Sequence, residues 1–257
     1  MTGKRSAMSI LSTVLLIYAG CCVYLYLAQR SFIYFPTRPA AGVAADDLRL
    51  ELDGATVQVW RLSGHSEDAI IYFGGNAEDV ALNVGQFSGL WPRKAIYLVN
   101  YRGYGASSGA PSETAIAADA QAIYDYVSRA HARISVIGRS LGSGVATLLA
   151  ATRDVNRLVL VTPFDSIARV AQTSFPIFPV SLLLKDRYDS VSRAGRISAP
   201  TLILVAGRDE FIPMKSSQNL AAALDPSLTT VTVIDGAGHN TIQDFHGYTE
   251  ALAEFLP

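Results

Sequence analysis

The chain has 257 residues, half of them hydrophobic, and a formal net charge of −1 at pH 7. This length suits one large domain or two small ones, and the apolar content is enough for a sizeable core. The balanced charge, without a basic stripe, argues against a nucleic-acid-binding protein, because such proteins cluster lysine and arginine on one face. The two cysteines, Cys21 and Cys22, are adjacent within an apolar run, which suits neither a disulfide framework nor a zinc site.

The first 30 residues predict a membrane anchor. Lys4 and Arg5 precede an uncharged, mostly apolar stretch over 6–29, which is about long enough to cross a bilayer. The apolar region of a cleaved signal peptide is shorter, and Tyr18 makes "YAGC" a poor match to a lipoprotein cleavage box. We therefore expect an uncleaved single-pass helix with residues 8–28 in the membrane, and a cleaved signal is the alternative.

The charges around this stretch give an expected orientation. The amino-terminal flank carries slightly more positive charge, so the positive-inside bias places the amino terminus in the cytoplasm and the rest of the protein outside. Residues 31–47 are predicted to be a linker. Its aromatic residues suit the membrane interface, and its prolines end any helix.

Beyond the linker, the apolar pattern alternates between strand-like and helix-like segments. Two alternating segments, 48–52 and 56–62, predict an antiparallel hairpin. Short continuous apolar runs predict buried strands at 69–73, 95–100, 134–138, 158–162, 201–207 and 229–235. Helix-like stretches lie near 78–90, 113–130, 141–152, 165–185, 214–224 and 241–256. This alternation predicts one α/β domain over 48–257, with a mostly parallel central sheet and helices on both faces.

The turn after the expected strand 134–138 contains a candidate nucleophile. It reads Gly138-Arg139-Ser140-Leu141-Gly142, the G-x-S-x-G pattern of a nucleophile elbow between a strand and a helix. The pattern alone is weak, because glycine and serine are common in turns and at helix starts. Its position at a strand end makes Ser140 a candidate nucleophile, since ligands of such sheets bind beyond the carboxyl ends of the strands.

Two further strand ends supply the partners that such a serine needs. Asp209 follows the strand 201–207, and His239 lies in the glycine-flanked loop after 229–235. The chain order Ser140, Asp209, His239 is that of the α/β-hydrolase fold. Glu210 is the alternative acid, and Asp209 is favoured by its position in the motif.

The negative oxygen of a tetrahedral intermediate would need fixed donors. The N–H of Leu141, directly after the nucleophile, is one candidate. The second is expected in "YFGGNAED", where Gly74 and Gly75 let the backbone approach the site. We assign it to Asn76, with Ala77 as the alternative.

Several motifs together resemble one family. "QRSFIYFPTRP", "YFGGNAED", "NYRGYGASSGAPSE", "GRSLGSG", "GRDEFIP" and "GAGHN" occur in that order. From about Gln29 onward the chain resembles membrane-anchored single-domain α/β-hydrolases related to the bud-emergence homologue proteins and acyl-protein thioesterases. The resemblance implies hydrolysis of lipids or fatty-acyl thioesters. Gly74 stands where the family usually has histidine, and Asn100 where it usually has aspartate.

Other residues near these motifs have less specific readings. We expect Arg102 to tie loops together, with substrate contact as the alternative for Arg102 and Tyr104. Ser143 is expected to pack within its helix. The histidines His65, His131 and His246 are expected to be solvated. The apolar segment 174–190 is either an ordinary crossover helix or part of a short cap, placed at about 165–190, that lines an acyl pocket.

The sequence thus predicts a serine hydrolase of ester or thioester bonds that acts on lipid-like or acylated substrates. A serine aminopeptidase is the first alternative, and a non-catalytic membrane-tethered scaffold is the second. No metal cluster, phosphate-binding P-loop or dinucleotide fingerprint is present in the sequence, so we expect no cofactor.

Overall fold

The central feature of the fold is an eight-stranded sheet. The computed structural model describes residues 2–64 and 66–257. The strands follow the order β1-β2-β4-β3-β5-β6-β7-β8. Strand β2 pairs antiparallel with β1 and with β4, and all other neighbours are parallel. The bounds are β1 Asp46–Leu52, β2 Ala55–Leu62, β3 Asp68–Phe73, β4 Ala95–Val99, β5 Arg133–Arg139, β6 Leu158–Val161, β7 Thr201–Ala206 and β8 Thr229–Ile234.

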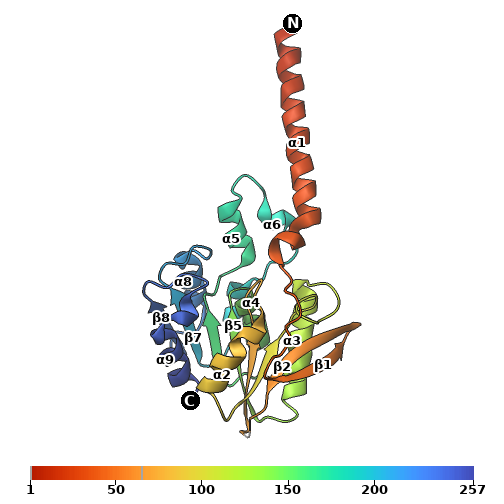
Figure 1. Cartoon of the computed structure of the whole chain (residues 1–257). Helices are drawn as coiled ribbons and strands as arrows, with labels where there is room; N and C mark the ends of the chain where they lie inside the picture. The colour runs from red at the N-terminus through yellow and green to blue at the C-terminus, as the bar shows by residue number, and fades with distance from the viewer. Residues whose placement is uncertain (1, 65) are drawn as a thin grey trace.

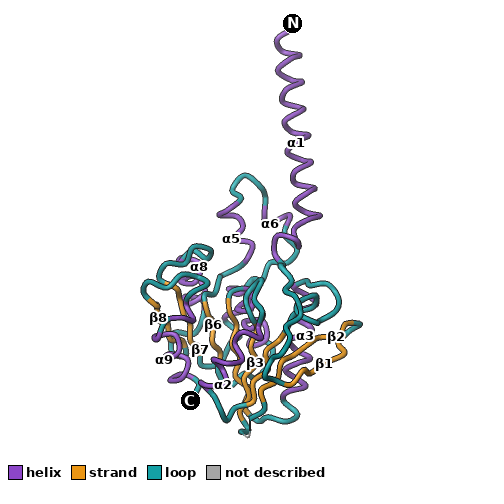
Figure 2. The backbone as a smooth tube through the Cα atoms, viewed as in Figure 1, coloured by secondary structure: helices purple, strands orange, loops and turns teal. Residues whose placement is uncertain are grey.

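Helices cover both faces of this sheet, as Figures 1 and 2 show. The helices are α1 Thr2–Ile33, η1 Val80–Asn83, α2 Val84–Leu90, α3 Glu113–Val127, α4 Leu141–Ala150, α5 Ile167–Ser174, α6 Val180–Leu183, α7 Ser190–Ala194, α8 Met214–Ala223, η2 Ile242–Asp244 and α9 His246–Phe255. Helices α3, α4, α7 and α8 contribute to one core layer, and α2 and α9 contribute to the other.

The two core layers explain why the inner strands read as continuous apolar runs. Along β3, Ile71 and Phe73 pack into the layer of α3 and α4, while Ile70 and Tyr72 pack into the layer of α2 and α9. Because side chains alternate between the faces of a strand, a strand covered on both sides must be apolar at every position. The predicted α/β-hydrolase fold with a mostly parallel sheet is confirmed.

Three expected helices are divided in the structure. The stretch 165–185 forms α5 and α6, separated by a turn that contains Pro176 and Pro179. Proline lacks the backbone donor and clashes with the preceding turn, so one continuous helix cannot form there. The stretch 78–90 begins as a 3₁₀ turn, η1, before α2, and 241–256 contains η2 before α9.

Helix α1 projects from the body of the molecule, and only its carboxyl-terminal half contacts the body (Figure 1). Residues 31–33, expected in the linker, continue the helix, because no proline occurs before Pro36 and Ile33 is buried against the domain. The stretch Ala7–Ile33 is long and apolar enough to cross a membrane. A signal sequence at the amino terminus shares this length and composition.

Candidate active site

Ser140 lies in a strained turn between β5 and α4. Its backbone has φ 49° and ψ −114°, a conformation that residues other than glycine rarely adopt. The flanking glycines make this turn possible. A Cβ at Gly138 would lie 2.3 Å from the Gly142 carbonyl oxygen, and a Cβ at Gly142 would lie 2.0 Å from that of Phe73. The sequence therefore places Ser140 at the tip of an elbow that only glycine neighbours allow.

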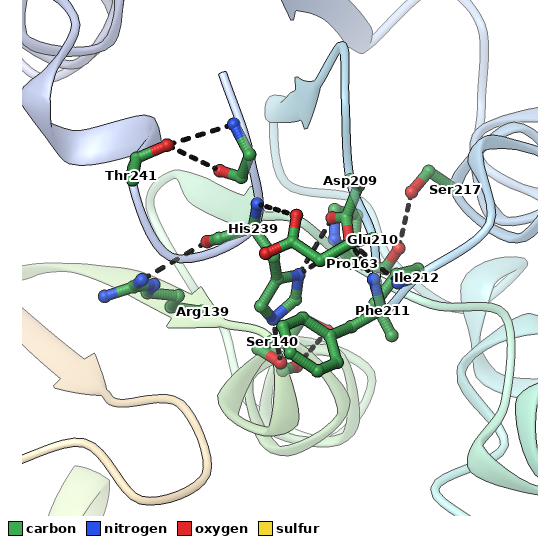
Figure 3. A network of polar contacts seen from close by, with 12 residues as sticks. Arg139, Ser140, Pro163, Asp209, Glu210, Phe211, Ile212, Ser217, His239 and Thr241 are labelled. Atoms are coloured by element: carbon green, nitrogen blue, oxygen red, sulfur yellow. Dashed lines mark hydrogen bonds and ion pairs between the residues drawn. The ribbon is translucent and has the colours of Figure 1, made fainter.

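The structure brings Ser140, His239 and Asp209 into one chain of contacts (Figure 3). The Nε2 atom of His239 is 2.9 Å from Ser140 Oγ, and its Nδ1 atom is 2.8 Å from Asp209 Oδ2. The side chains of His239 and Asp209 are only 8% and 5% exposed, so the contact between them is shielded from water. Three residues from the ends of β5, β7 and β8 thus form the geometry of a Ser-His-Asp triad.

Asp209 and Glu210 occupy different positions in this arrangement. Asp209 Oδ1 accepts the backbone N–H groups of Phe211 and Ile212, at 2.9 and 2.7 Å, which fix the carboxylate toward the imidazole. Glu210 instead accepts the backbone N–H of His239 at 3.1 Å. Of the two acids weighed from the sequence, Asp209 is the one that contacts the imidazole ring, and Glu210 holds the loop that carries it.

The expected oxyanion residues, Asn76 and Leu141, line the same cavity as Ser140. Leu141 is the first residue of α4, so its N–H has no partner within the helix. The loop of Asn76 approaches closely, because a Cβ at Gly75 would lie 3.6 Å from Ser140 Cβ. Ala77 follows with φ 58°, a left-handed conformation that turns the chain sharply after Asn76.

The side chain of Asn76 is held by residues that sequence reasoning did not connect with it. Its Oδ1 accepts the Tyr104 hydroxyl at 2.8 Å and the backbone N–H of Phe35 at 2.9 Å. Tyr104 was weighed as a substrate contact, but it is buried and braces the loop of Asn76. The aromatic and glycine-rich pattern "NYRGYG" was the available signal, and it does not say which loop the tyrosine supports.

Glu78 was also missed. Its carboxylate accepts the Gly75 N–H at 2.5 Å and the Tyr72 hydroxyl at 2.6 Å. Burial, followed by the nearby Glu78 charge, raises the pKa of Tyr72 well above its usual value, so this hydroxyl remains a donor. The signal was an acidic residue directly after the glycine-rich loop, but the neighbouring Asp79 made either residue a plausible helix cap.

A cavity of about 360 Å³ opens from Ser140 toward the cap and α1. Its walls are almost wholly apolar, and Gln29, Asn76 and Ser140 are the only polar residues among those that line it. The segment 167–183, containing α5 and α6, forms one side, so this part of the expected cap does line a pocket. The lining residues are Leu25, Gln29, Phe32, Ile33, Asn76, Ser140, Leu141, Phe164, Ile167, Val170, Ala171, Phe175, Phe178, Val180, Leu183, Leu184, Phe211 and Ile212.

Arg102 and Ser143 have the structural roles that the sequence predicts for them. Arg102 ties loops together through a paired contact with Asp119 and bonds to the carbonyls of Leu52 and Asp53. Ser143 is fully buried in α4 and donates to the carbonyl of Ser140 at 2.6 Å.

The expectation of solvated histidines is wrong for one of the three. His131 packs against Tyr97, with Nε2 3.0 Å from the hydroxyl, and burial lowers its pKa. His246 is exposed, as expected, and His65 lies outside the described residues. Among the residues described, no group of histidine, cysteine, aspartate or glutamate side chains is placed to hold a metal ion.

Comparisons with known proteins identify the family to which this fold belongs. The family model described as "alpha/beta hydrolase fold" matches residues 68–180. A Mycobacterium tuberculosis protein described as uncharacterised, Rv2307c, is 34% identical over 275 residues, which cover 100% of this chain and 97% of that protein. Human alpha/beta hydrolase domain-containing protein 17B is 28% identical over 202 residues, covering 76% of this chain and 68% of that protein. The chain belongs to the α/β-hydrolase superfamily.

Solved structures share the fold at low sequence identity. The Pyrococcus furiosus esterase Pf2001 superimposes with a TM-score of 0.67 at 17% identity, over 87% of this chain and 97% of that one. A structure described as a membrane phospholipase A and bacterial virulence factor superimposes with a TM-score of 0.65 at 15% identity, over 99% of this chain and 96% of that one. These similarities show that the chain shares the fold of these proteins.

Proposed function

We propose that this protein is a serine hydrolase that cleaves carboxylic ester or thioester bonds through an acyl-enzyme intermediate. The observation that carries the proposal is the contact chain from Ser140 Oγ through the His239 ring to Asp209, at 2.9 and 2.8 Å. No cofactor enters the reaction.

The geometry supports a two-step reaction. In the first step, Ser140 Oγ attacks the carbonyl carbon while His239 Nε2 takes the serine proton, and Asp209 stabilises the imidazolium. The N–H groups of Asn76 and Leu141 are proposed to stabilise the negative oxygen. His239 then gives its proton to the leaving alcohol or thiol. In the second step, water attacks the acyl-serine with the same proton transfers, which releases the acid and regenerates Ser140.

The cavity favours acylated substrates. Its lining contains no charged side chain, and the amide of Gln29 is already bonded to the Leu183 carbonyl and the Lys185 N–H. An acyl chain would therefore be buried without leaving a polar wall group unpaired. An aminopeptidase would need a carboxylate near Ser140 to hold the substrate amine, and none lines this cavity. The same cavity makes a purely scaffolding role the weaker alternative.

We further propose that α1 is an uncleaved anchor with its amino terminus in the cytoplasm. Its apolar length and the positive charge of Lys4 and Arg5 support this arrangement. A reporter fused to either end of the full chain tests it. A protease-protected amino terminus together with an accessible carboxyl terminus is expected in spheroplasts, and loss of residues 1–30 from the mature chain would contradict it.

The catalytic proposal is tested by labelling the full chain, purified in detergent, with a fluorophosphonate probe. We expect labelling of the wild type and of Ser128→Ala, an exposed serine at the end of α3. Ser140→Ala should abolish labelling, and His239→Ala should reduce it strongly. A folded wild-type chain that does not react would support the scaffold. Preferential cleavage of aminoacyl amides over nitrophenyl esters would support the peptidase.

A further inference from the structure

The carboxyl-terminal turns of α1 form part of the wall of the candidate active-site cavity. Leu25, Gln29, Phe32 and Ile33 line it together with the cap. Their spacing of four, three and one residues places them on one face of a helix. On this face Gln29 and Ile33 are buried, whereas Leu27, which points away, is 73% exposed. The same helix that supplies the candidate anchor therefore supplies a wall of the cavity.

Specific contacts fix this part of α1 to the cap segment. Gln29 bonds to both Leu183 and Lys185, as described above. Arg30 Nε lies 2.9 Å from the buried carboxylate of Asp186. Beyond the helix, the hydroxyls of Tyr34 and Tyr188 lie 2.9 Å apart in the core. The helix is thus held in a defined position over the cavity and is not a flexible tether.

The contacts of Tyr18 place the cap at the depth of the apolar helix. The Tyr18 hydroxyl donates to the Ile177 carbonyl at 2.8 Å, and its ring stacks on Phe178 with centroids 5.6 Å apart. A bilayer core of about 30 Å needs about 20 helical residues. If the span starts as early as Ala7, it ends near Tyr26, and Tyr18 lies about 12 Å inside that end. A later start would place Tyr18 deeper.

The cap surface beside Tyr18 is suited to hydrocarbon. Phe175, Ile177 and Leu182 are 47%, 72% and 79% exposed, although they are large apolar residues. Exposed apolar clusters of this kind mark contact with a membrane or a partner. Lys185 is exposed, and its Nζ atom lies 4.1 Å from the centroid of the Tyr26 ring, near the end of this span, where a leaflet presents its phosphate groups.

We propose that the cap and the carboxyl-terminal half of α1 lie in one leaflet, and that the cavity receives an acyl chain of a membrane glycerophospholipid directly from that leaflet. Leu25 and Phe32 set the length of chain that fits. This inference rests on the proposed function. Ser140 takes the acyl group, the ester C–O bond breaks, the lysolipid alcohol leaves with the proton from His239, and water then releases the fatty acid.

The first test measures chain-length preference with the full chain in nanodiscs of phosphatidylcholine and phosphatidylglycerol. Leu25→Trp narrows the cavity, and Leu27→Trp places the same bulk on the exposed face as a control. We expect Leu25→Trp to lower release of palmitate relative to decanoate by about fourfold for each methylene group that no longer fits. Leu27→Trp should leave both this ratio and nitrophenyl butyrate hydrolysis unchanged. Phe32→Ala should shift the preference toward longer chains.

The outcomes separate this inference from the catalytic proposal. A wild type that neither reacts with fluorophosphonate nor cleaves nitrophenyl butyrate would overturn the proposed function. A wild type that does both, but whose chain-length ratio is the same in Leu25→Trp, Phe32→Ala and Leu27→Trp, would overturn only the role of α1. Activity on an acylated peptide without release of fatty acid from the phospholipids would overturn the lipid substrate.

A second measurement tests the depth of the cap. The two native tryptophans, Trp60 and Trp91, are buried, so a tryptophan introduced at Ile177 reports its own surroundings. Lipids brominated along their acyl chains should quench Ile177→Trp strongly. They should not quench Val231→Trp, at an exposed position on the edge strand β8. Equal quenching of the two variants would contradict immersion of the cap.

Discussion

Arg139, the residue before Ser140, forms an ion pair with Glu78 in the loop after β3. Arg139 Nη1 lies 3.5 Å from Glu78 Oε2, and the two side chains are 13% and 11% exposed. Arg139 also donates to the carbonyl of His239 at 3.3 Å, and Glu78 accepts the N–H of Gly75. The pair therefore links the nucleophile elbow, the histidine loop and the candidate oxyanion loop. Burial acts to lower the pKa of Arg139, but the Glu78 charge together with Tyr72 and Tyr248 outweighs burial, so the pKa is raised.

Replacing Glu78 with glutamine should damage stability and activity together. The change leaves the Arg139 guanidinium buried without a counter-charge, which costs about 3–5 kcal/mol when a buried pair is broken. The Gly75 loop should also shift, so kcat should fall more than KM changes. Urea unfolding and ester kinetics measure the two effects. Asp79→Asn is the matched control. It also removes one negative charge, but at the residue that caps η1, and it should lower the unfolding free energy by less than about 1 kcal/mol.

Asp209 and Glu210 should differ sharply in their effect on catalysis. Asp209→Asn keeps the shape but removes the charge that holds the His239 tautomer, so kcat should fall by about 10⁴-fold. Glu210→Gln keeps an acceptor for the His239 N–H, so its loss should stay within about tenfold. Steady-state kinetics on one nitrophenyl ester compare the two variants. If Glu210→Gln were the more damaging change, the assignment of the acid would be reversed.

The strands and the three strand-end residues could be predicted because each has a local signal. Apolar runs mark buried strands, and the order of Ser140, Asp209 and His239 matches a known topology. The strained turn at Ser140 is also visible locally, because only small neighbours permit it. These features depend on a few adjacent residues and on the rule that strand ends share one edge of the sheet.

The bracing contacts could not be predicted, because they join residues far apart along the chain. Phe35 and Tyr104 meet at Asn76 only when the segment after α1 lies across the sheet edge. Nor does the sequence show that Tyr18 contacts Phe178, since an apolar helix that contains tyrosine has the same sequence pattern whether or not it contacts a cap. The division of 165–185 into two helices was missed although it had a local signal, the prolines at 176 and 179.

Tyr104→Phe should show how far the brace on Asn76 matters. One of the two donors to Asn76 Oδ1 is lost, and a small shift of the candidate oxyanion loop should lower kcat by about tenfold. KM should change little, because the cavity lining is intact.

The same tyrosine makes stability depend on alkaline pH. Burial raises the pKa of Tyr104 from its ordinary 10.0 to about 12. The folded chain therefore keeps a proton that the unfolded chain loses above pH 10, and this contribution to the free energy of unfolding falls as pH rises from 10 to 12. Thermal unfolding of wild type and Tyr104→Phe should converge over that range. Parallel curves would contradict this assignment.

Gly142→Ala should disrupt folding, whereas Gly85→Ala should not. A methyl group at Gly142 would overlap the Phe73 carbonyl oxygen at 2.0 Å, so α4 would have to move away from β3. We expect the unfolding free energy to fall by about 3 kcal/mol or more, because overpacking typically costs about 1–3 kcal/mol and this overlap is severe. Gly85 lies on the exposed surface of α2 with open space around it, and alanine there should stabilise the protein by about 0.5–1 kcal/mol.

The two aspartates of α3 that pair with arginine should differ in their contribution to stability. Asp119 pairs with Arg102, and their side chains are 6% and 9% exposed, whereas Asp125 pairs with Arg153 at 50% and 29% exposure. Asp119→Asn strands a buried guanidinium and should cost about 3–5 kcal/mol. Asp125→Asn removes a solvent-screened pair and should cost at most about 1 kcal/mol. Both arginines donate through Nε and Nη2 to their aspartates, so the two ion pairs share the same hydrogen-bond geometry and differ in burial.

Urea unfolding at low and at 1 M salt measures the loss of unfolding free energy in each variant. Equal costs for the two variants would show that water reaches Arg102 in the folded protein.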